Sequence, residues 1–237
     1  MSLFTISSIT CTQCARIYPT RVVGSLNADR RPDLRQSLLD NHFQDAECPN
    51  CGHSVRLAPN FTYIDSGRGQ WIVALPAGEM PHYRSYEARV AELFDRSYGA
   101  GAPASARSLG AALAPRVTFG WPAVREKVLI RELGLDDTLV ELVKLDLVRR
   151  VPSIPLRPGI EQRMVGMDDG RMRFEWLGSD DEAPLSGLSV GRELYDTIAA
   201  DTPGWQATRA LLSEGCFVDM QKTYMHDGPV DAMVALA

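Results

Sequence analysis

The sequence predicts an α+β fold with a strand-rich N-terminal part, a helical middle segment and a small antiparallel β/α unit near the C-terminus. Three observations predict it. Two Cys-x2-Cys pairs near the N-terminus alternate with short runs of β-branched and aromatic residues. Apolar residues between positions 122 and 149 recur with a helical period, and Asp168-Asp-Gly170 separates two alternating runs in the last third of the chain.

Four of the five cysteines form two pairs of identical spacing, Cys11-Thr-Gln-Cys14 and Cys48-Pro-Asn-Cys51, with 33 residues between them. A two-residue gap lets one tight turn point both sulfur atoms at the same ion, and two such turns supply the tetrahedral donor set of a structural zinc ribbon. Gly52 suits the positive φ at which the second turn closes. The sequence therefore predicts one structural Zn²⁺ with Cys11, Cys14, Cys48 and Cys51 as its ligands.

Other uses of these cysteines are disulfides, a redox pair of the thioredoxin type, or iron. Disulfides are disfavoured in a reducing compartment, and a redox pair is disfavoured because neither pair opens a helix after a strand. A catalytic zinc keeps an open coordination position, which four thiolates do not leave. His53 could be mistaken for a ligand, but we expect it to be a neighbour that offsets negative charge.

The remaining pattern of the N-terminal part predicts β-hairpins around the cysteine pairs. Phe61-Thr-Tyr-Ile-Asp65 and Trp71-Ile-Val-Ala-Leu75 are apolar runs joined by the hairpin-like Ser66-Gly-Arg-Gly69. Strands are also expected at residues 17–23 and 54–57, and a helix is expected at 30–39.

These residues resemble the CpXC family, a bacterial and archaeal zinc-ribbon-like domain without an assigned biochemical role. The resemblance is carried by Cys48-Pro-Asn-Cys51-Gly52-His53, by Tyr63-Ile-Asp65, and by Trp71-Ile-Val with Pro76 closing the strand. Thr12 stands in the first pair where Pro49 stands in the second, which affects the rigidity of the turn and not ligation. The resemblance covers residues 5–80 and continues, more weakly, to about residue 149.

The middle of the chain predicts three helices. The first is expected at residues 82–98, followed by a flexible connection in the Gly- and Ala-rich segment 99–106. The second runs from Pro122 to Leu133, with Gly134 as the residue that ends it. Asp136 is expected to cap the third helix, which continues through about Arg149. The Leu and Val residues of these helices are expected to form core rather than a partner groove.

The last third predicts strands at residues 161–167 and 171–177, a helix at 192–200, and a strand at 216–225. The chain is thus expected to comprise a CpXC-like zinc-ribbon domain at residues 1–98, the connection at 99–106, and a helical segment with a C-terminal α+β unit at 107–237. Cys216 is expected to be a buried core cysteine.

Gly187-Leu-Ser189-Val-Gly191 matches the G-x-S-x-G pattern of a hydrolase nucleophile, and His226 follows in the chain. That motif requires a buried strand before the serine, whereas residues 180–184 are polar. We therefore expect Ser189 to begin or cap a helix.

Charge and composition restrict the function further. The chain has 237 residues and a formal net charge of −5, and residues 151–237 contain 14 acidic against 7 basic residues. No concentrated basic segment of the kind that neutralises phosphates is present. No apolar run is long enough to span a membrane, and no signal peptide is recognisable, so a cytoplasmic protein is expected.

The function expected from the sequence is a zinc-stabilised, non-catalytic component that binds another protein or assembles with it. A nucleic-acid-binding zinc ribbon is the alternative, because zinc ribbons often serve that role; Arg16, Arg21, Arg30, Arg31, Arg35 and Arg56 would then have to form one face. An enzyme with an unrecognised site is the third hypothesis. A homo-oligomer is compatible with the sequence.

Overall fold

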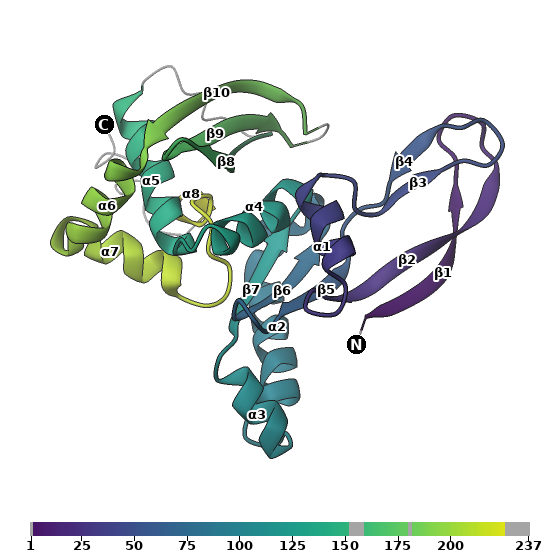
Figure 1. Ribbon diagram of the computed structural model, residues 1–237, viewed down its shortest axis with the longest axis horizontal. Coiled ribbons are helices and arrows are strands. Elements are labelled where there is room, and N and C mark those ends of the chain that lie inside the picture. Colours follow the sequence, from purple (N-terminus) through teal and green to yellow (C-terminus); the bar gives the residue numbers. More distant parts are fainter. Residues whose placement is uncertain (1, 152–158, 180–181, 226–237) are drawn as a thin grey trace. The chain divides into compact units, whose positions relative to one another are not determined.

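The computed structural model describes residues 2–151, 159–179 and 182–225, and it has the mixed α+β architecture that the sequence predicts (Figure 1). The chain divides into two compact units, Met1–Arg125 and Glu126–Ala237. The division falls within helix α4 (Trp121–Glu132), and helix α3 (Ala104–Gly110) begins inside the segment expected to be a flexible connection. The domain limits expected from the sequence stay a prediction.

The first unit is organised around a five-stranded mixed sheet with the strand order β1-β2-β5-β6-β7. Neighbours β1 and β2, and β5 and β6, are antiparallel, whereas β2–β5 and β6–β7 are parallel. The strands are β1 (Leu3–Thr10), β2 (Ile17–Asn27), β5 (Phe61–Asp65), β6 (Gln70–Leu75) and β7 (Ala114–Phe119). The predicted hairpin of β5 and β6 is confirmed, while β1 and β7 are not among the predicted elements.

Helices accompany this sheet: α1 (Pro32–Leu39), the 3-10 helix η1 (Ala77–His82), α2 (Tyr83–Tyr98) and α3. Helix α2 packs on the sheet through its aromatic residues, with the ring of Phe94 centred 5.2 Å from that of Trp71 on β6. Val90 of α2 is buried as well. The helix predicted at residues 82–98 is confirmed. Its apolar residues recur with a helical period, so they lie on the face that meets the sheet.

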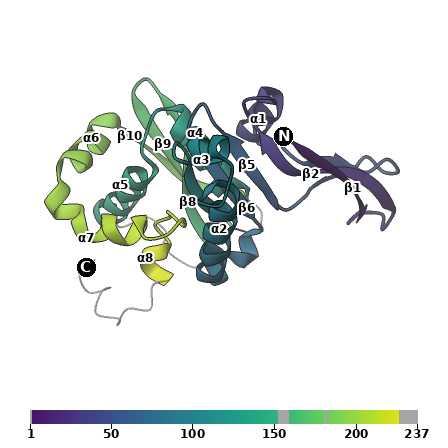
Figure 2. The ribbon, with the colours of Figure 1, turned by 90° about the horizontal axis from the view of Figure 1, so that it is seen from below.

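The β1–β2 hairpin extends beyond the rest of the sheet (Figures 1 and 2). Strand β2 pairs with β5 only through Ser25–Asn27, so most of its length is bonded to β1 alone. A second, shorter hairpin, β3 (Asp45–Glu47) with β4 (Ser54–Arg56), runs alongside it (Figure 1). A two-stranded hairpin is at best marginally stable in water, so these two hairpins need a further stabilising interaction.

The second unit contains a three-stranded antiparallel sheet of order β10-β9-β8, formed by β8 (Ile160–Asp168), β9 (Arg171–Gly178) and β10 (Pro184–Gly191). The predicted β8–β9 hairpin is confirmed. Its two turn residues, Asp169 and Gly170, have positive φ values of 49° and 73°, which match the twist of a tight hairpin turn.

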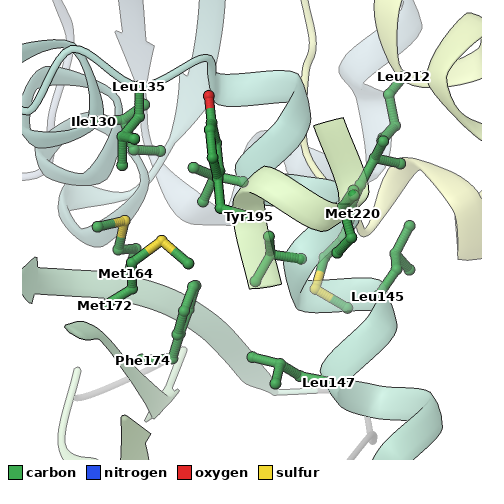
Figure 3. Packing of buried hydrophobic residues seen from close by; sticks show 14 of the residues in the cluster. Ile130, Leu135, Leu145, Leu147, Met164, Met172, Phe174, Tyr195, Leu212 and Met220 are labelled. Carbon is green, nitrogen blue, oxygen red and sulfur yellow. The ribbon is translucent and has the colours of Figure 1, made fainter. Parts of the chain in front are cut away.

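Helices α5 (Asp137–Arg150), α6 (Arg192–Ala200) and α7 (Thr202–Ser213) pack with this sheet around one apolar core. Figure 3 shows Met164, Met172 and Phe174 of the sheet together with residues of these helices in that core. The predicted capping of α5 is confirmed, since the Asp136 carboxylate accepts a hydrogen bond from the Leu139 N–H at 3.0 Å. The Leu and Val residues of α5 are core, as expected.

Charged side chains are buried in the second unit as a connected network. Lys144 Nζ lies 2.8 Å from Glu126 Oε1 and 2.9 Å from Glu141 Oε2, and all three side chains are fully buried. Lys127 Nζ lies 3.0 Å from Glu141 Oε1. The network therefore joins α4 to α5 by reciprocal ion pairs.

Arg163 of β8 extends this network. Its guanidinium lies 3.1 Å from Glu126, 2.6 Å from Glu161 and 2.6 Å from Asp219. Burial alone would raise the pKa of Asp219, but the positive charges of Arg163 and Lys144 lower it to about 2. The carboxylates also bond backbone N–H groups: Glu126 accepts from Met164 at 2.6 Å and Glu141 accepts from Met220 at 2.9 Å.

Two expectations for the last third are wrong. Residues 216–225 do not form a strand: they lead into the short helix α8 (Lys222–Met225). The alternating apolar residues lie in a turn instead. In this turn the Asp219 carboxylate pairs with Arg163, and the Met220 N–H donates to Glu141. Ser189 does not begin or cap a helix, because it lies in strand β10 opposite Arg173, and Gly191 precedes α6.

No helix in the described part of the chain is long and apolar enough to cross a bilayer.

The buried network makes a prediction about stability. Lys144→Met should lower the free energy of unfolding by about 3–5 kcal/mol, because it leaves Glu126 and Glu141 buried without their shared cation. Arg150→Met is the control: that arginine is exposed and its ion pair with Asp146 should contribute less than about 1 kcal/mol. Urea unfolding of the two variants measures both values, and equal losses would contradict the prediction.

Candidate metal centre

The two cysteine pairs lie in the turns of the two adjoining hairpins. Cys11 and Cys14 lie between β1 and β2, and Cys48 and Cys51 lie between β3 and β4. Because the hairpins run side by side, their turns meet, and one sulfur atom from each cysteine lies within 4.8 Å of the other three. The structure thus brings together all four residues that the sequence singles out as metal ligands.

The distances between the sulfur atoms fit a tetrahedral metal centre. Cys11 Sγ lies 3.7 Å from Cys51 Sγ, and Cys14 Sγ lies 3.7 Å from Cys48 Sγ. Four sulfurs placed 2.3 Å from a tetrahedral zinc are separated by about 3.8 Å. The gap between the two turns therefore has the size of one such ion, and the donor set suits zinc or iron.

The two turns share one backbone pattern. In the first, the N–H of Cys11 bonds the Arg16 carbonyl and the N–H of Ala15 bonds the Cys11 carbonyl, each at 2.9 Å. In the second, Cys48 bonds His53 and Gly52 bonds Cys48, again at 2.9 Å. The residue after the second cysteine has positive φ in both turns, 58° at Ala15 and 71° at Gly52. The positive φ expected at Gly52 is confirmed, and Ala15 adopts it despite its Cβ.

Hydrogen bonds to the sulfur atoms shift the pKa values of two of the cysteine thiols in opposite directions. The backbone N–H of Arg16, together with the side chains of Cys51 and Asn50, lowers the pKa of the Cys14 thiol to about 6. The His53 N–H acts in the same sense on Cys51, but burial and hydrogen bonds with the other three sulfurs raise the pKa of that thiol to about 12. A cation bound by the four sulfurs would displace the protons of their thiols.

Side chains around the sulfurs link the two turns to each other. Asn50 of the second turn donates its amide N–H to Cys14 Sγ at 3.6 Å. His53, which closes the second turn, also reaches the first turn: its Nε2 lies 3.1 Å from the hydroxyl of Thr12. His53 therefore lies beside the sulfur cluster, as a neighbour of the four cysteines. Such bonds around the ligands orient them.

The cluster has one buried and one open side. Cys11 and Cys48 are each 1% exposed and pack with Tyr18, whereas Cys14 is half-buried and Cys51 is exposed. Burial and the nearby cysteine charges raise the pKa of the Tyr18 hydroxyl. This hydroxyl finds no hydrogen-bond partner among the described residues. The apolar contacts of the site are thus few, and they are confined to its buried side.

A comparison with protein families identifies the chain. The family model described as CpXC protein matches residues 9–144, which is more than half of the sequence. The chain belongs to the CpXC family. No curated protein and no solved structure matches it.

The matched region of this CpXC protein contains all four clustered cysteines and reaches into helix α5. Cys216 lies outside it and is buried without a disulfide, like the core cysteine expected there. The serine of the G-x-S-x-G motif lies within a strand, so it lacks the strand-to-helix turn of a nucleophile elbow. His226 lies outside the described residues.

The matched turns of this CpXC protein allow a test of the backbone pattern. Gly52→Ala should weaken zinc binding by about 1 kcal/mol, because the added Cβ meets only Glu47 Oε1 at 3.8 Å and the cost is the positive φ alone. Ala15→Gly should strengthen it by up to about 1 kcal/mol for the same reason. Competition with a chromophoric chelator measures both; effects of the same sign would contradict the shared pattern.

Proposed function

We propose that this protein is a non-catalytic, zinc-stabilised component that binds another protein, with one structural Zn²⁺ held by Cys11, Cys14, Cys48 and Cys51. The observation that carries the proposal is the tetrahedral spacing of the four sulfur atoms at the meeting point of two hairpins. All five cysteines are outside disulfides, which suits a reducing compartment such as the cytoplasm.

A structural role for the ion follows from how little else holds the two hairpins together at this end. The distal part of β1–β2 is bonded to no further strand of the described chain, and most residues of β1 are exposed. The β3–β4 hairpin has three residues in each strand. An ion that binds both turns supplies the folding free energy that a core of this size does not.

The donor set supports a role without catalysis. Four thiolates fill a tetrahedral shell, whereas a catalytic zinc needs a position open to water or substrate. Among the described residues of the second unit, the buried carboxylates of Glu126, Glu141 and Asp219 are each paired with a buried cation, which argues against a catalytic role for these three groups. We therefore assign the ion to stability and not to chemistry.

The arginines of the first unit favour a protein partner over nucleic acid. Arg35 is buried and lies 3.3 Å from Asp65, and Arg31 is paired with Asp33 at 2.6 Å. Arg56 stacks over the ring of Trp121. At least three of the six arginines that would have to form a phosphate-binding face are thus engaged within the protein. The same unit exposes large apolar side chains, namely Leu3, Ile6 and Ile17, which suit a protein surface.

The zinc assignment predicts a stoichiometry. Protein purified without added metal should contain about one equivalent of zinc per chain, and Cys48→Ser should lose it, because three thiolates leave the tetrahedral set incomplete. Cys216→Ser is the matched control and should retain the metal, since Cys216 is not part of the cluster. Metal analysis by mass spectrometry decides between zinc and iron. Zinc retained without both cysteine pairs would refute the site.

Removal of the ion should unfold the hairpins locally. A strong chelator is expected to speed amide exchange between Cys14 and Cys48, while α5 and the β8–β9 hairpin, which have their own core, exchange as before. Exchange that stays equally slow near the cysteines after stripping would show that the ion is dispensable for folding.

The proposed binding role predicts the outcome of a pull-down from a lysate of the host. Tagged wild-type protein and Cys216→Ser should recover the same protein partner at physiological salt, and Cys48→Ser should lose it, because its hairpins are no longer held together. Nuclease treatment should leave this recovery unchanged. If the protein instead bound heparin with a steep salt dependence, losing about 10³ in affinity between 50 and 200 mM salt, the nucleic-acid alternative would be correct.

A further inference from the structure

The edges of the two main sheets differ in how they are protected from pairing with another strand. Strand β7 contains Pro115 and packs against α2, and strand β10 contains Pro184 and Gly187. On the edge strand β8, the N–H of Met164 is already bonded to the carboxylate of Glu126. Proline and a covering group are both devices that keep an edge from accepting a strand.

Strand β1 has none of these devices. Its sequence, Leu3-Phe-Thr-Ile-Ser-Ser-Ile-Thr10, contains no charge, no proline and no glycine over eight residues. In the described structure it is the end strand of its sheet and pairs only with β2. Ile6, in its middle, is 78% exposed, more than any other large apolar side chain described. An uncharged apolar edge of this length is a template for another strand.

We propose that β1 pairs antiparallel with β1 of a second copy of this chain, with Ile6 on the two-fold axis. This deepens the proposed protein-binding role by naming one partner. Centring the pair on Ile6 matches apolar with apolar or hydroxyl with hydroxyl at every facing pair except Phe4 with Ser8. The facing pairs are Ile6 with Ile6, Leu3 with Ile9, and Thr5 with Ser7, with Phe4 opposite Ser8.

Charge favours a second copy as the occupant. Like charges directly opposite one another destabilise a strand pair, and an identical β1 brings none. The nearest charge across the hairpin is Arg21, which lies opposite Ile6 on β2. In the dimer the two Arg21 side chains are three strand spacings apart, about 14 Å, which exceeds the screening length of about 8 Å at physiological salt.

The size of the contact sets the expected affinity. One added strand pair belongs to the small class of specific interfaces, so a dissociation constant of roughly 1–100 μM is expected. Because the interface carries no ion pair, this constant should be nearly independent of ionic strength.

The test is the oligomeric state of the full-length, zinc-loaded protein, measured by sedimentation equilibrium up to about 500 μM, well above the expected dissociation constant. Wild type should dimerise. Ile6→Lys should raise the dissociation constant at least about tenfold, because it removes the contact between the two facing isoleucines and places two ammonium groups face to face. Zinc content, measured on the same samples, shows that each variant is folded.

Two comparisons identify the edge and the register. Ile17→Lys introduces the same charge on the same face of the hairpin, at an exposed residue of the interior strand β2, and should leave the dimer intact. Ile6→Glu alone should be monomeric, but mixed with Ile6→Lys it should form a heterodimer, because residue 6 faces residue 6 across the axis.

Three results would overturn the proposal. Wild type could remain monomeric, which would leave a strand of a different protein as the candidate. The dimer could survive Ile6→Lys, or Ile6→Lys and Ile17→Lys could weaken it equally, which would place the contact on the face of the hairpin instead of its edge. A zinc-loaded monomer that still captures a partner would refute the self-pairing alone and not the proposed function.

Discussion

Four sulfur atoms, all within 4.8 Å of one another, lie where two hairpins meet, and only a small apolar cluster around Tyr18 holds the hairpins together at that end. Neither hairpin has the apolar surface to fold alone, and β2 reaches the rest of the sheet only at Ser25–Asn27. The spacing of the sulfurs, the positive φ of Ala15 and Gly52, and the bonds of Asn50 and His53 all serve this one junction. The exposed length of β1 depends on it too, since an unconnected ribbon would not keep a fixed edge.

The second unit is held by a different kind of constraint. Its helices and sheet enclose an apolar core, but beside that core lie Glu126, Glu141, Lys144 and Arg163, fully buried and mutually paired. Such pairs contribute little net stability, yet each member is costly to leave alone, so they fix which segments meet. The buried ion pairs of this unit hold its helices and sheet in place. The sulfur cluster does the same for the two hairpins of the other unit.

The two proposals assign separate tasks to the first unit. The cysteine cluster stabilises the hairpins and offers no open position for chemistry, whereas the uncharged strand β1 offers backbone groups to another chain. The exposed isoleucines Ile6 and Ile17 lie on one face of the same hairpin. Under these two proposals, the ribbon serves contact with another chain.

The sequence by itself determined features that depend on a few neighbouring residues. The Cys-x2-Cys turns, the Asp136 cap and the Asp169-Gly170 turn follow from local geometry, and each lies where it is predicted. Only the tertiary structure decided that Glu126 and Lys144 are buried. These two residues pair with each other, but they lie 18 residues apart in the sequence and on different helices. It also decided that β1 is a strand, whose apolar residues do not alternate, and that residues 216–225 turn into a helix. Local rules act over one or two turns of chain, whereas burial and charge pairing depend on segments that only folding brings together.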